Sequence, residues 1–251
     1  MKPIIKTKKV FKKFGAEGSE RTVIDGIDLE IYENDFTVIM GSSGAGKSTL
    51  MYLLSGMDTP NAGEILFDGT DITKISSEEM AVFRRKHCGF VFQQIYMLEG
   101  MSLLDNVLMT GLLMNKNKKA VLAKAEELFD RVNIDKVTRN KKSNQVSGGE
   151  CQRAGIVRAA INDPQVVFAD EPTGALNSSN STAVLDVLTG LNATGQSIIM
   201  VTHDKKSALR GNRIIYLKDG KIFGELKLPK YSETDKTRTE KLDKFLAKMG
   251  W

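Results

Sequence analysis

The chain has 251 residues, of which 41% are hydrophobic, and it carries a formal net charge of +5 at pH 7. This length allows one α/β domain with small subdomains to bury a full core. Lysines and arginines concentrate near the N-terminus and in the tail, where acidic residues lie between them, so we expect a solvated surface and no nucleic-acid partner, which would need a denser basic stripe.

The chain starts with segments that favour β-strands. We predict strands near residues 5–11, 23–31 and 63–68, which would form a β-rich subdomain. The segment that ends at Phe14 is expected to be an edge strand, which disfavours a core position for the Phe14 ring. The first residues, Met1 to Lys6, lack the apolar stretch of a signal peptide.

A phosphate-binding motif follows these strands. Residues 41–49 match G-x-x-x-x-G-K-[ST] and lie between a predicted buried strand, Phe36–Met40, and a predicted helix, so a chance glycine-rich turn is disfavoured. Glycines let the backbone wrap a polyphosphate, and the helix start presents N–H groups to it. Lys47 is expected to reach the β- and γ-phosphates, and Ser48 is expected to bind Mg²⁺. The predicted contacts with a nucleoside triphosphate are Gly41, Ser42, Ser43, Gly44, Ala45, Gly46, Lys47, Ser48 and Thr49.

The middle of the chain is predicted to be helical. Between Leu103 and Val137, apolar side chains recur at the spacing of a helix face. Further on, Ser147, Gly148 and Gly149 precede another predicted helix and form a second helix start that can bind an anion. The apolar positions of the first region are Val121, Leu122, Ala125, Leu128, Phe129 and Val132.

Two later strands are predicted to carry polar residues at their tips. Val166–Glu171 ends in two carboxylates, at the edge where open α/β sheets bind ligands. Asp170 suits a Mg²⁺ shell, and Glu171 can orient and deprotonate an attacking water. Ser197–Thr202 leads to His203, whose imidazole can donate to a γ-phosphate or hold that water. The alternative for these three side chains is a structural role, such as acids at a helix start.

The tail is predicted to be an amphipathic helix. From Asp235 to Met249, the apolar residues Leu242, Phe245, Leu246 and Met249 share one helical face. Gly250 followed by Trp251 predicts a Schellman-like stop. We favour packing of this helix on its own subunit, and contact with a partner is the alternative.

The sequence predicts neither a membrane span nor a cysteine metal site. No uninterrupted apolar run approaches the ~20 residues that a spanning helix needs. Cys88 and Cys151 lack metal-ligand spacing, so we expect two reduced thiols in a cytosolic protein. If the protein acts at a membrane, another chain must supply the spanning part.

Taken in chain order, these motifs resemble those of the nucleotide-binding subunits of ATP-binding-cassette (ABC) transporters, and the resemblance covers nearly the whole chain. Residues 41–49 resemble the Walker A loop, Val146–Glu150 the LSGGQ signature, and Phe168–Glu171 the Walker B motif. Each motif alone is moderately specific, but the ordered set is very specific.

Three single residues complete the resemblance. Gln93 resembles the Q-loop glutamine, which contacts Mg²⁺ and lies near the permease, and Phe14 resembles the aromatic A-loop residue that stacks on adenine. His203 resembles the switch histidine. The resemblance therefore implies Glu171, His203 and Gln93 as catalytic residues and Ser48, Gln93 and Asp170 as Mg²⁺ ligands.

The resemblance implies an α/β fold of the P-loop NTPase type, with a RecA-like core, an antiparallel β subdomain and a helical signature subdomain at about residues 95–160. The ATPase domain would span residues 1–228, and residues 229–251 would form a charged segment with the tail helix. ATP and Mg²⁺ are the implied cofactors. The implied partners are a second copy, whose ATP would be contacted by Ser147, Gly148 and Gly149, and an integral-membrane permease at the cytoplasmic face of the cell membrane.

Three positions depart from the family pattern. Phe14 replaces Tyr and keeps the ring face, whose stacking contributes roughly 1–3 kcal/mol per base. Glu150 replaces Gln, and we expect this change to be neutral because a negative charge is favourable at a helix start. Asn177 replaces Asp and loses its charge. Asn177 therefore either weakens the coupling between the two ATP sites or is a tolerated swap.

Leu54–Pro60 and Asp170–Gly174 resemble the ABC branch that includes macrolide exporters, lipoprotein-release ATPases and bacitracin-type peptide exporters. We therefore expect an ATPase that exports or detoxifies peptide, antibiotic or lipidic cargo through a separate FtsX-like permease, with a role in antimicrobial peptide resistance. One alternative is an FtsE-like ATPase that signals through a membrane partner without transport. A soluble ABC ATPase of DNA repair or translation is disfavoured, because the chain has one cassette and no heptad run. Tyr96–Leu98, beside Gln93, is open between a permease contact and a core position.

Overall fold

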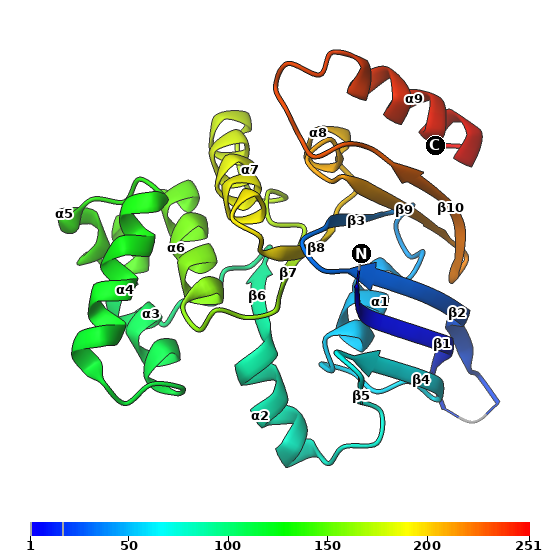
Figure 1. Ribbon diagram of the computed structural model, residues 1–251, viewed down its shortest axis with the longest axis horizontal. Helices are drawn as coiled ribbons and strands as arrows, with labels where there is room; N and C mark the ends of the chain where they lie inside the picture. The colour runs from blue at the N-terminus through cyan, green and yellow to red at the C-terminus, as the bar shows by residue number, and fades with distance from the viewer. Residues whose placement is uncertain (1, 17) are drawn as a thin grey trace. The chain divides into compact units, whose positions relative to one another are not determined.

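The computed structural model describes residues 2–16 and 18–251 (Figure 1). The chain forms two compact units. The first unit joins Met1–Met80 with Gly195–Trp251, and the second unit is Ala81–Thr194. The first unit is therefore built from two segments that lie far apart in the sequence. The helix α2 (Ser77–His87) contains the boundary between the units.

The first unit contains an antiparallel sheet in the order β2-β1-β4-β5. The predicted strands near residues 5–11, 23–31 and 63–68 are confirmed. The expected edge strand at Phe14 is wrong, because β1 pairs with β2 on one side and with β4 on the other. The last β1–β4 pair joins Phe11 to Ala62, so Phe14 has only β2 beside it. The strands are β1 (Pro3–Phe14), β2 (Arg21–Tyr32), β4 (Ala62–Phe67) and β5 (Thr70–Asp71).

The first unit also holds parallel strands. β3 (Phe36–Met40) pairs in parallel with β8 (Ser197–Val201) and with β9 (Arg213–Lys218), and β10 (Lys221–Lys227) pairs antiparallel with β9. Every residue of β3 and β8 is buried, as continuous β-branched runs predict for central parallel strands. The strands predicted before the phosphate loop and before His203 are therefore confirmed. The helices of this unit include α1 (Lys47–Leu54), α8 (Lys205–Ala208) and α9 (Thr237–Met249).

The tail helix α9 packs on its own unit, as the sequence favoured. Leu242, Phe245 and Leu246 are buried, and α9 lies against β10. The predicted Schellman stop is confirmed, because Trp251 N donates to Leu246 O at 3.1 Å and Gly250, with φ of 79°, donates to Ala247 O at 3.2 Å. The domain limit expected at residue 228 stays a prediction.

The second unit is mainly helical. Its two strands, β6 (Cys88–Phe92) and β7 (Val166–Asp170), pair in parallel. The α/β class predicted from the sequence is confirmed. The helices are α3 (Leu103–Leu112), α4 (Lys118–Arg131), α5 (Lys136–Arg139), α6 (Gly148–Ala160), α7 (Ser178–Ala193) and the 3₁₀ turn η1 (Ser143–Gln145).

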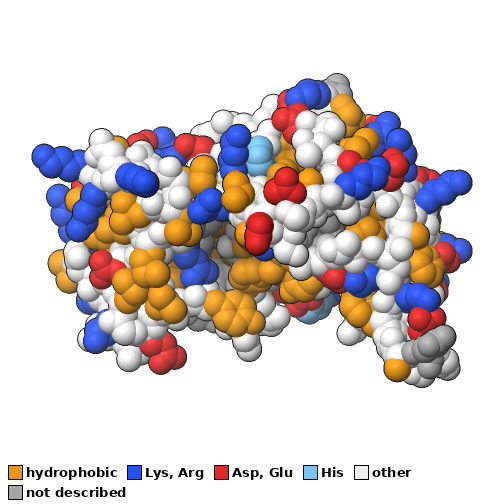
Figure 2. Space-filling view, turned by 90° about the horizontal axis from the view of Figure 1, so that it is seen from below, with side chains coloured by type: hydrophobic (Ala, Val, Ile, Leu, Met, Phe, Trp, Pro, Cys, Tyr) orange, Lys and Arg blue, Asp and Glu red, His pale blue; other side chains and the backbone are white. Residues whose placement is uncertain are grey.

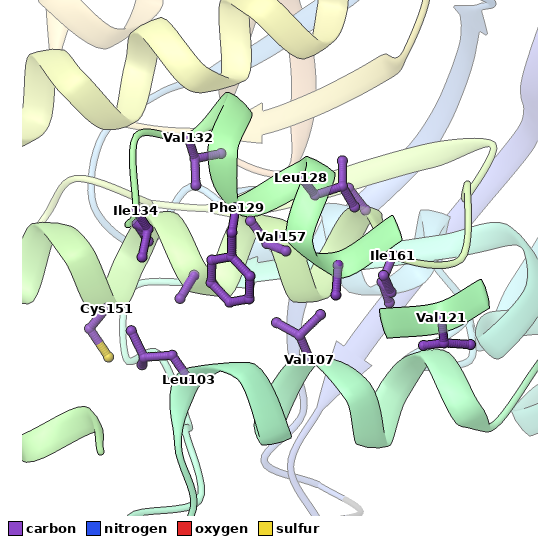
Figure 3. Close-up of a cluster of buried hydrophobic side chains, with 13 residues drawn as sticks. Leu103, Val107, Val121, Leu128, Phe129, Val132, Ile134, Cys151, Val157 and Ile161 are labelled. Carbon is purple, nitrogen blue, oxygen red and sulfur yellow. The ribbon is translucent and has the colours of Figure 1, made fainter. Parts of the chain in front are cut away.

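The region predicted to be helical from Leu103 to Val137 is interrupted. Asn117 caps α4 by accepting from Ala120 N at 3.2 Å, and Asn133, with φ of 55°, follows the end of α4. Side-chain capping and a left-handed backbone both end helices, and neither feature is visible in the apolar spacing. The Phe129 ring lies at the centre of the cluster formed by α3, α4 and α6 (Figure 3).

Two further sequence expectations concern a membrane-spanning helix and the two cysteines. Among them, no helix combines the length and the apolar character needed to cross a bilayer. Cys88 and Cys151 are buried free thiols, and burial raises the pKa of Cys88 to about 12. A thiol with such a pKa is a poor nucleophile at neutral pH.

Candidate nucleotide site

The phosphate loop begins where the buried strand β3 ends. At Gly41, with φ of +155°, a Cβ atom would lie 2.2 Å from Leu217 O. At Gly46, with φ of +97°, it would lie 2.7 Å from Val23 O. Only glycine tolerates both positions, because the surrounding backbone fills the space that a side chain would need. The loop between them, Ser42 to Gly44, is exposed. The sequence motif therefore forms an exposed loop, Ser42 to Gly44, between two glycine positions that leave no room for a side chain.

Lys47 completes this cradle. Its side chain is only 7% exposed, and Nζ donates to Ser42 O at 2.9 Å. Among the described residues, no side chain forms a capping hydrogen bond at the start of α1, and the first turn of α1 contains no acidic residue. A helix start with these properties attracts an anion, and the buried ammonium adds a full positive charge. The loop therefore fits a polyphosphate.

The phosphate loop and His203 lie at the same edge of one sheet. β3 and β8 run in parallel, with Ile39 opposite Val201, and Thr202 N donates to Ile39 O at 3.2 Å. The carboxyl ends of both strands therefore meet at one edge, which is where open α/β sheets bind ligands. His203 is exposed there, directly before α8.

Phe14 lies at the end of β1 and is 47% exposed. The alternative of a core position for this ring is therefore wrong. The Lys12 ammonium lies 4.8 Å from the centre of the ring and is itself paired with Asp58 at 2.6 Å. The Phe14 ring is thus an exposed aromatic surface with a cation beside it, and such a ring offers a face for a nucleobase to stack on.

In the second unit, Gln93 and Asp170 also lie at one edge. β6 and β7 are parallel, and Phe92 is paired with Asp170, so Gln93 follows directly beside the tip of β7. A Cβ atom on Gly174 would lie 2.7 Å from Gln93 Nε2. The loop after β7 therefore packs directly against the Gln93 side chain.

Glu171 adopts an unusual backbone conformation. Its φ of 43° lies in the left-handed region, although it is not a glycine. The Glu171 carbonyl accepts from Gly174 N at 3.0 Å, which fixes the turn after β7. Such conformations cost on the order of 1–3 kcal/mol and concentrate at functional sites. Glu171 shares this conformation with seven other non-glycine residues of the described chain, and among the predicted site residues other than glycine it is the one that adopts it.

The signature segment, residues 146–150, is held by a capping box. Ser147 caps α6, the Ser147 hydroxyl accepts from Glu150 N at 3.2 Å, and Glu150 Oε2 accepts from Ser147 N at 2.8 Å. The hydrogen bonds from Ser147 lower the pKa of Glu150. Ser147 and Gly148 are exposed, whereas Gly149 is buried, and a Cβ atom on Gly149 would lie 2.5 Å from Asn180 Oδ1. The start of α6 therefore lies directly against the start of α7.

Two positioning residues were not found by sequence reasoning. Gln152 is 1% exposed, and its Nε2 donates to Phe92 O at 3.0 Å. Arg158 donates to Ile95 O at 2.6 Å and to Tyr96 O at 2.8 Å. Both side chains project from α6 and hold the backbone on either side of Gln93. The available signal was weak, because α6 also carries the polar residues Glu150 and Arg153, which do not hold this backbone.

The predicted site residues therefore form two groups, one in each unit. The phosphate loop, Phe14 and His203 belong to the first unit, and the second unit holds Gln93, Asp170, Glu171, Ser147, Gly148 and Gly149. Within residues 2–16 and 18–251, no three His, Cys, Asp or Glu side chains cluster closely enough to hold a metal ion.

Comparison with known proteins supports a nucleotide-binding role. A family model described as ABC transporter matches residues 24–174. The bacitracin export ATP-binding protein BceA of Halalkalibacterium halodurans is 36% identical over 224 residues, which are 89% of this chain and 88% of that protein. The lipoprotein-releasing system ATP-binding protein LolD of Aquifex aeolicus is 39% identical over 205 residues, which are 81% of this chain and 91% of that protein.

The chain is also similar to part of a longer relative and to a solved structure. The macrolide export ATP-binding/permease protein MacB of Pasteurella multocida is 40% identical over 223 residues, and the chain spans 34% of that relative's length. The solved dimer of the ATP-binding cassette MJ0796 bound to ADP and Pi is 33% identical, with a TM-score of 0.81. That similarity covers 90% of this chain and 100% of the solved chain.

Proposed function

The chain belongs to the ABC transporter family, and from this membership we propose that it is the ATP-hydrolysing subunit of a membrane exporter. Its cargo would be a peptide, an antibiotic or a lipidic molecule that passes through a separate FtsX-like permease. The relatives named for bacitracin export, lipoprotein release and macrolide export support this class of cargo. The observation that carries the proposal is the phosphate loop, with its exposed segment Ser42 to Gly44, its two sterically required glycines and its buried Lys47.

ATP would bind mainly to the first unit. Lys47 and the N–H groups at the start of α1 would hold the phosphates, and the exposed Phe14 ring would stack on adenine. In the first unit Ser48 would be a Mg²⁺ ligand, and in the second unit Gln93 and Asp170 would be Mg²⁺ ligands; bound Mg²⁺ would neutralise phosphate charge.

Hydrolysis would use Glu171 as the general base. Glu171 would accept a proton from the attacking water while the oxygen of that water bonds to the γ-phosphorus and the bond to ADP breaks. His203 would hold the water or donate to the γ-phosphate from the edge that it shares with the phosphate loop. The left-handed backbone of Glu171 and the turn that Gly174 N closes by donating to Glu171 O support this role.

We expect two copies to share their sites. Ser147, Gly148 and Gly149 would contact the γ-phosphate held by the other subunit, because Ser147 and Gly148 are exposed at the start of α6. The dimeric state of the MJ0796 cassette supports this arrangement. The subunit would be peripheral, at the cytoplasmic face of the cell membrane.

An apolar surface of the second unit supports contact with a permease. Tyr96, Leu98 and Leu113 are more than half exposed, and Tyr96 is 66% exposed. Beside them, a groove of about 390 Å³ is lined by residues that include Phe90, Tyr96, Leu113 and Arg158. Figure 2 shows exposed hydrophobic side chains between charged ones on the side of the protein that it draws. For Tyr96 and Leu98, this exposure favours a partner contact over the core position that the sequence left open.

The Glu171→Gln variant tests the enzymatic part of the proposal. We expect ATP binding to be retained and hydrolysis to fall by roughly 10²–10⁴-fold, because the variant lacks a general base. Gel filtration with ATP should show an accumulated dimer. Glu240→Gln on α9, an exposed carboxylate paired with Lys244, is the matched control and should behave like the natural protein. Wild-type hydrolysis by Glu171→Gln would remove this residue from catalysis.

Export is tested by co-purification with the native permease and by a deletion strain. We expect the deletion to increase sensitivity to peptide antibiotics. An intact permease complex without any change in sensitivity would instead favour an FtsE-like role, in which the ATPase signals without transport.

A further inference from the structure

The tail helix α9 carries an arginine that is buried against the segment after His203. Arg238 is 2% exposed, and its guanidinium donates to the carbonyl oxygens of Leu209, Gly211 and Pro229, the last at 2.8 Å. Its charged group also lies 5.6 Å from the centre of the Tyr231 ring. One side chain of α9 therefore holds three carbonyls of the first unit.

Two of these carbonyls, those of Leu209 and Gly211, follow the short helix α8, which ends at Ala208 and has Leu209 as its C-cap, and the third, that of Pro229, follows β10. The last carbonyls of a helix have no partner inside the helix, and a cation there is favourable. Arg238 supplies both the hydrogen bonds and the charge. A helix of four residues is not stable by itself, so the position of α8 depends on such external contacts.

The other end of α8 is held from the same helix. Asp204 caps α8 by accepting from Ser207 N at 2.7 Å, and Lys205 Nζ forms an ion pair with Asp243 of α9 at 2.7 Å. His203 immediately precedes these residues, and His203, Asp243 and Trp251 line one pocket of about 520 Å³. Contacts from α9 therefore reach both ends of α8 and the pocket that contains His203.

We propose that Arg238 and Asp243 are positioning residues for ATP hydrolysis, which act by holding α8 and thereby His203. The inference rests on the role of His203 in the proposed function. A catalytic side chain that is displaced by about 1 Å can lose on the order of 10²-fold in rate, so a loosened α8 would slow turnover without weakening ATP binding. The tail helix would then be part of the hydrolytic machinery without touching the nucleotide.

Kinetics of the 251-residue chain test the proposal. Arg238→Met keeps the apolar stem, and we expect kcat to fall about tenfold with the KM for ATP within about twofold. Arg238→Lys should recover part of the rate, because one ammonium keeps the charge but cannot reach three carbonyls. Asp243→Asn, at a half-exposed ion pair, should lower kcat about two- to threefold. Glu240→Gln on the same helix should leave kcat unchanged, and an equal loss in that control would overturn the proposal.

A spectroscopic measurement follows His203 directly. The chain has only two histidines, His87 and His203, so NMR resolves one ring signal from each unit. We expect Arg238→Met and Asp243→Asn to shift or broaden the signal of His203 and to leave that of His87 unchanged. If Arg238→Met unfolds the chain, the same measurement can still be made on Asp243→Asn. A His203 signal unchanged in folded variants would overturn the proposal.

A double mutant separates this inference from the function on which it rests. If α9 acts through His203, Arg238→Met should cause no further loss of kcat in a His203→Ala background. An equal tenfold loss in both backgrounds would show that Arg238 acts elsewhere. Wild-type turnover by His203→Ala alone would instead remove the catalytic role of His203, whereas a shifted His203 signal would still show that α9 holds α8.

Discussion

Asn177 and Glu150, two of the residues that depart from the family pattern, both act at helix starts. Asn177 Oδ1 accepts from Asn180 N at 3.0 Å at the start of α7, and Glu150 accepts from Ser147 N at 2.8 Å at the start of α6. Asp in the first position and Gln in the second would accept the same hydrogen bonds. Each departure therefore keeps the local backbone and changes only the charge.

For Asn177→Asp, we expect an unchanged Hill coefficient and unchanged turnover for ATP. The cap of α7 is retained, and the added charge at a helix start stabilises it by about 0.3–1 kcal/mol. The measurement is steady-state ATPase kinetics on the permease complex. A steeper ATP dependence would show instead that the missing charge couples the two sites, within the usual range of about 1–3 kcal/mol.

Glu150→Gln separates the charge of this residue from its hydrogen bonds. The bonds from Ser147 lower the pKa of Glu150, so the carboxylate stabilises the fold at neutral pH, and this stabilisation is lost as pH falls through the lowered pKa. Glutamine does not titrate. We therefore expect the advantage in unfolding free energy of the natural protein over the variant to shrink as pH falls from neutral through the lowered pKa of Glu150. Urea unfolding at several pH values measures it, and a gap that is independent of pH would contradict the prediction.

At the scale of elements, α6 organises the second unit. It starts at the exposed signature segment, its Gln152 and Arg158 hold the backbone around Gln93, and Gly149 lies against α7. The signature and the Gln93 loop are therefore two parts of one helix assembly, and a shift of α6 would move both.

Gly149→Ala tests the contact between α6 and α7. A Cβ atom would lie 2.5 Å from Asn180 Oδ1, so we expect a loss of roughly 1–3 kcal/mol in the free energy of unfolding, as overpacking typically gives. Gly190→Ala in α7 is the matched control, because no described atom would lie within 4 Å of its Cβ. It should stabilise the chain by about 0.5–1 kcal/mol, since alanine favours a helix over glycine. Chemical unfolding of both variants measures these effects, and equal effects would contradict the prediction.

The sequence predicted correctly those helices, strands and loops that are determined by residues close together in the chain. The β-branched run of β3, the glycines of the phosphate loop and the apolar face of α9 each carry their own signal. The position of β1 inside its sheet was not predictable in this way, because it depends on a pairing with β4 that lies about 50 residues away. Gln152 and Arg158 were missed for the same reason, since their partners are backbone carbonyls of another segment.

At the scale of the whole molecule, the site residues are divided between two units, and the shared-site proposal predicts complementation. We expect Ser147→Arg to block hydrolysis without weakening ATP binding to the isolated subunit, because Ser147 would serve the nucleotide of the partner. A mixture with Lys47→Ala should regain activity at no more than one composite site per heterodimer. ATPase assays of the mixture measure this, and hydrolysis that rises linearly with the concentration of monomer would refute shared sites.

The discontinuity of the first unit has a consequence during protein synthesis. β3 pairs with β8 and β9, and both partners are synthesised only after the entire second unit. At a translation rate of roughly 5–20 residues per second, the synthesis of β8 and β9 follows that of β3 by on the order of 10–30 s. The second unit, in contrast, is continuous and can fold while the chain still emerges from the ribosome. A nascent chain therefore cannot use ATP to stabilise its phosphate loop until the segment with β8 and β9 has left the exit tunnel.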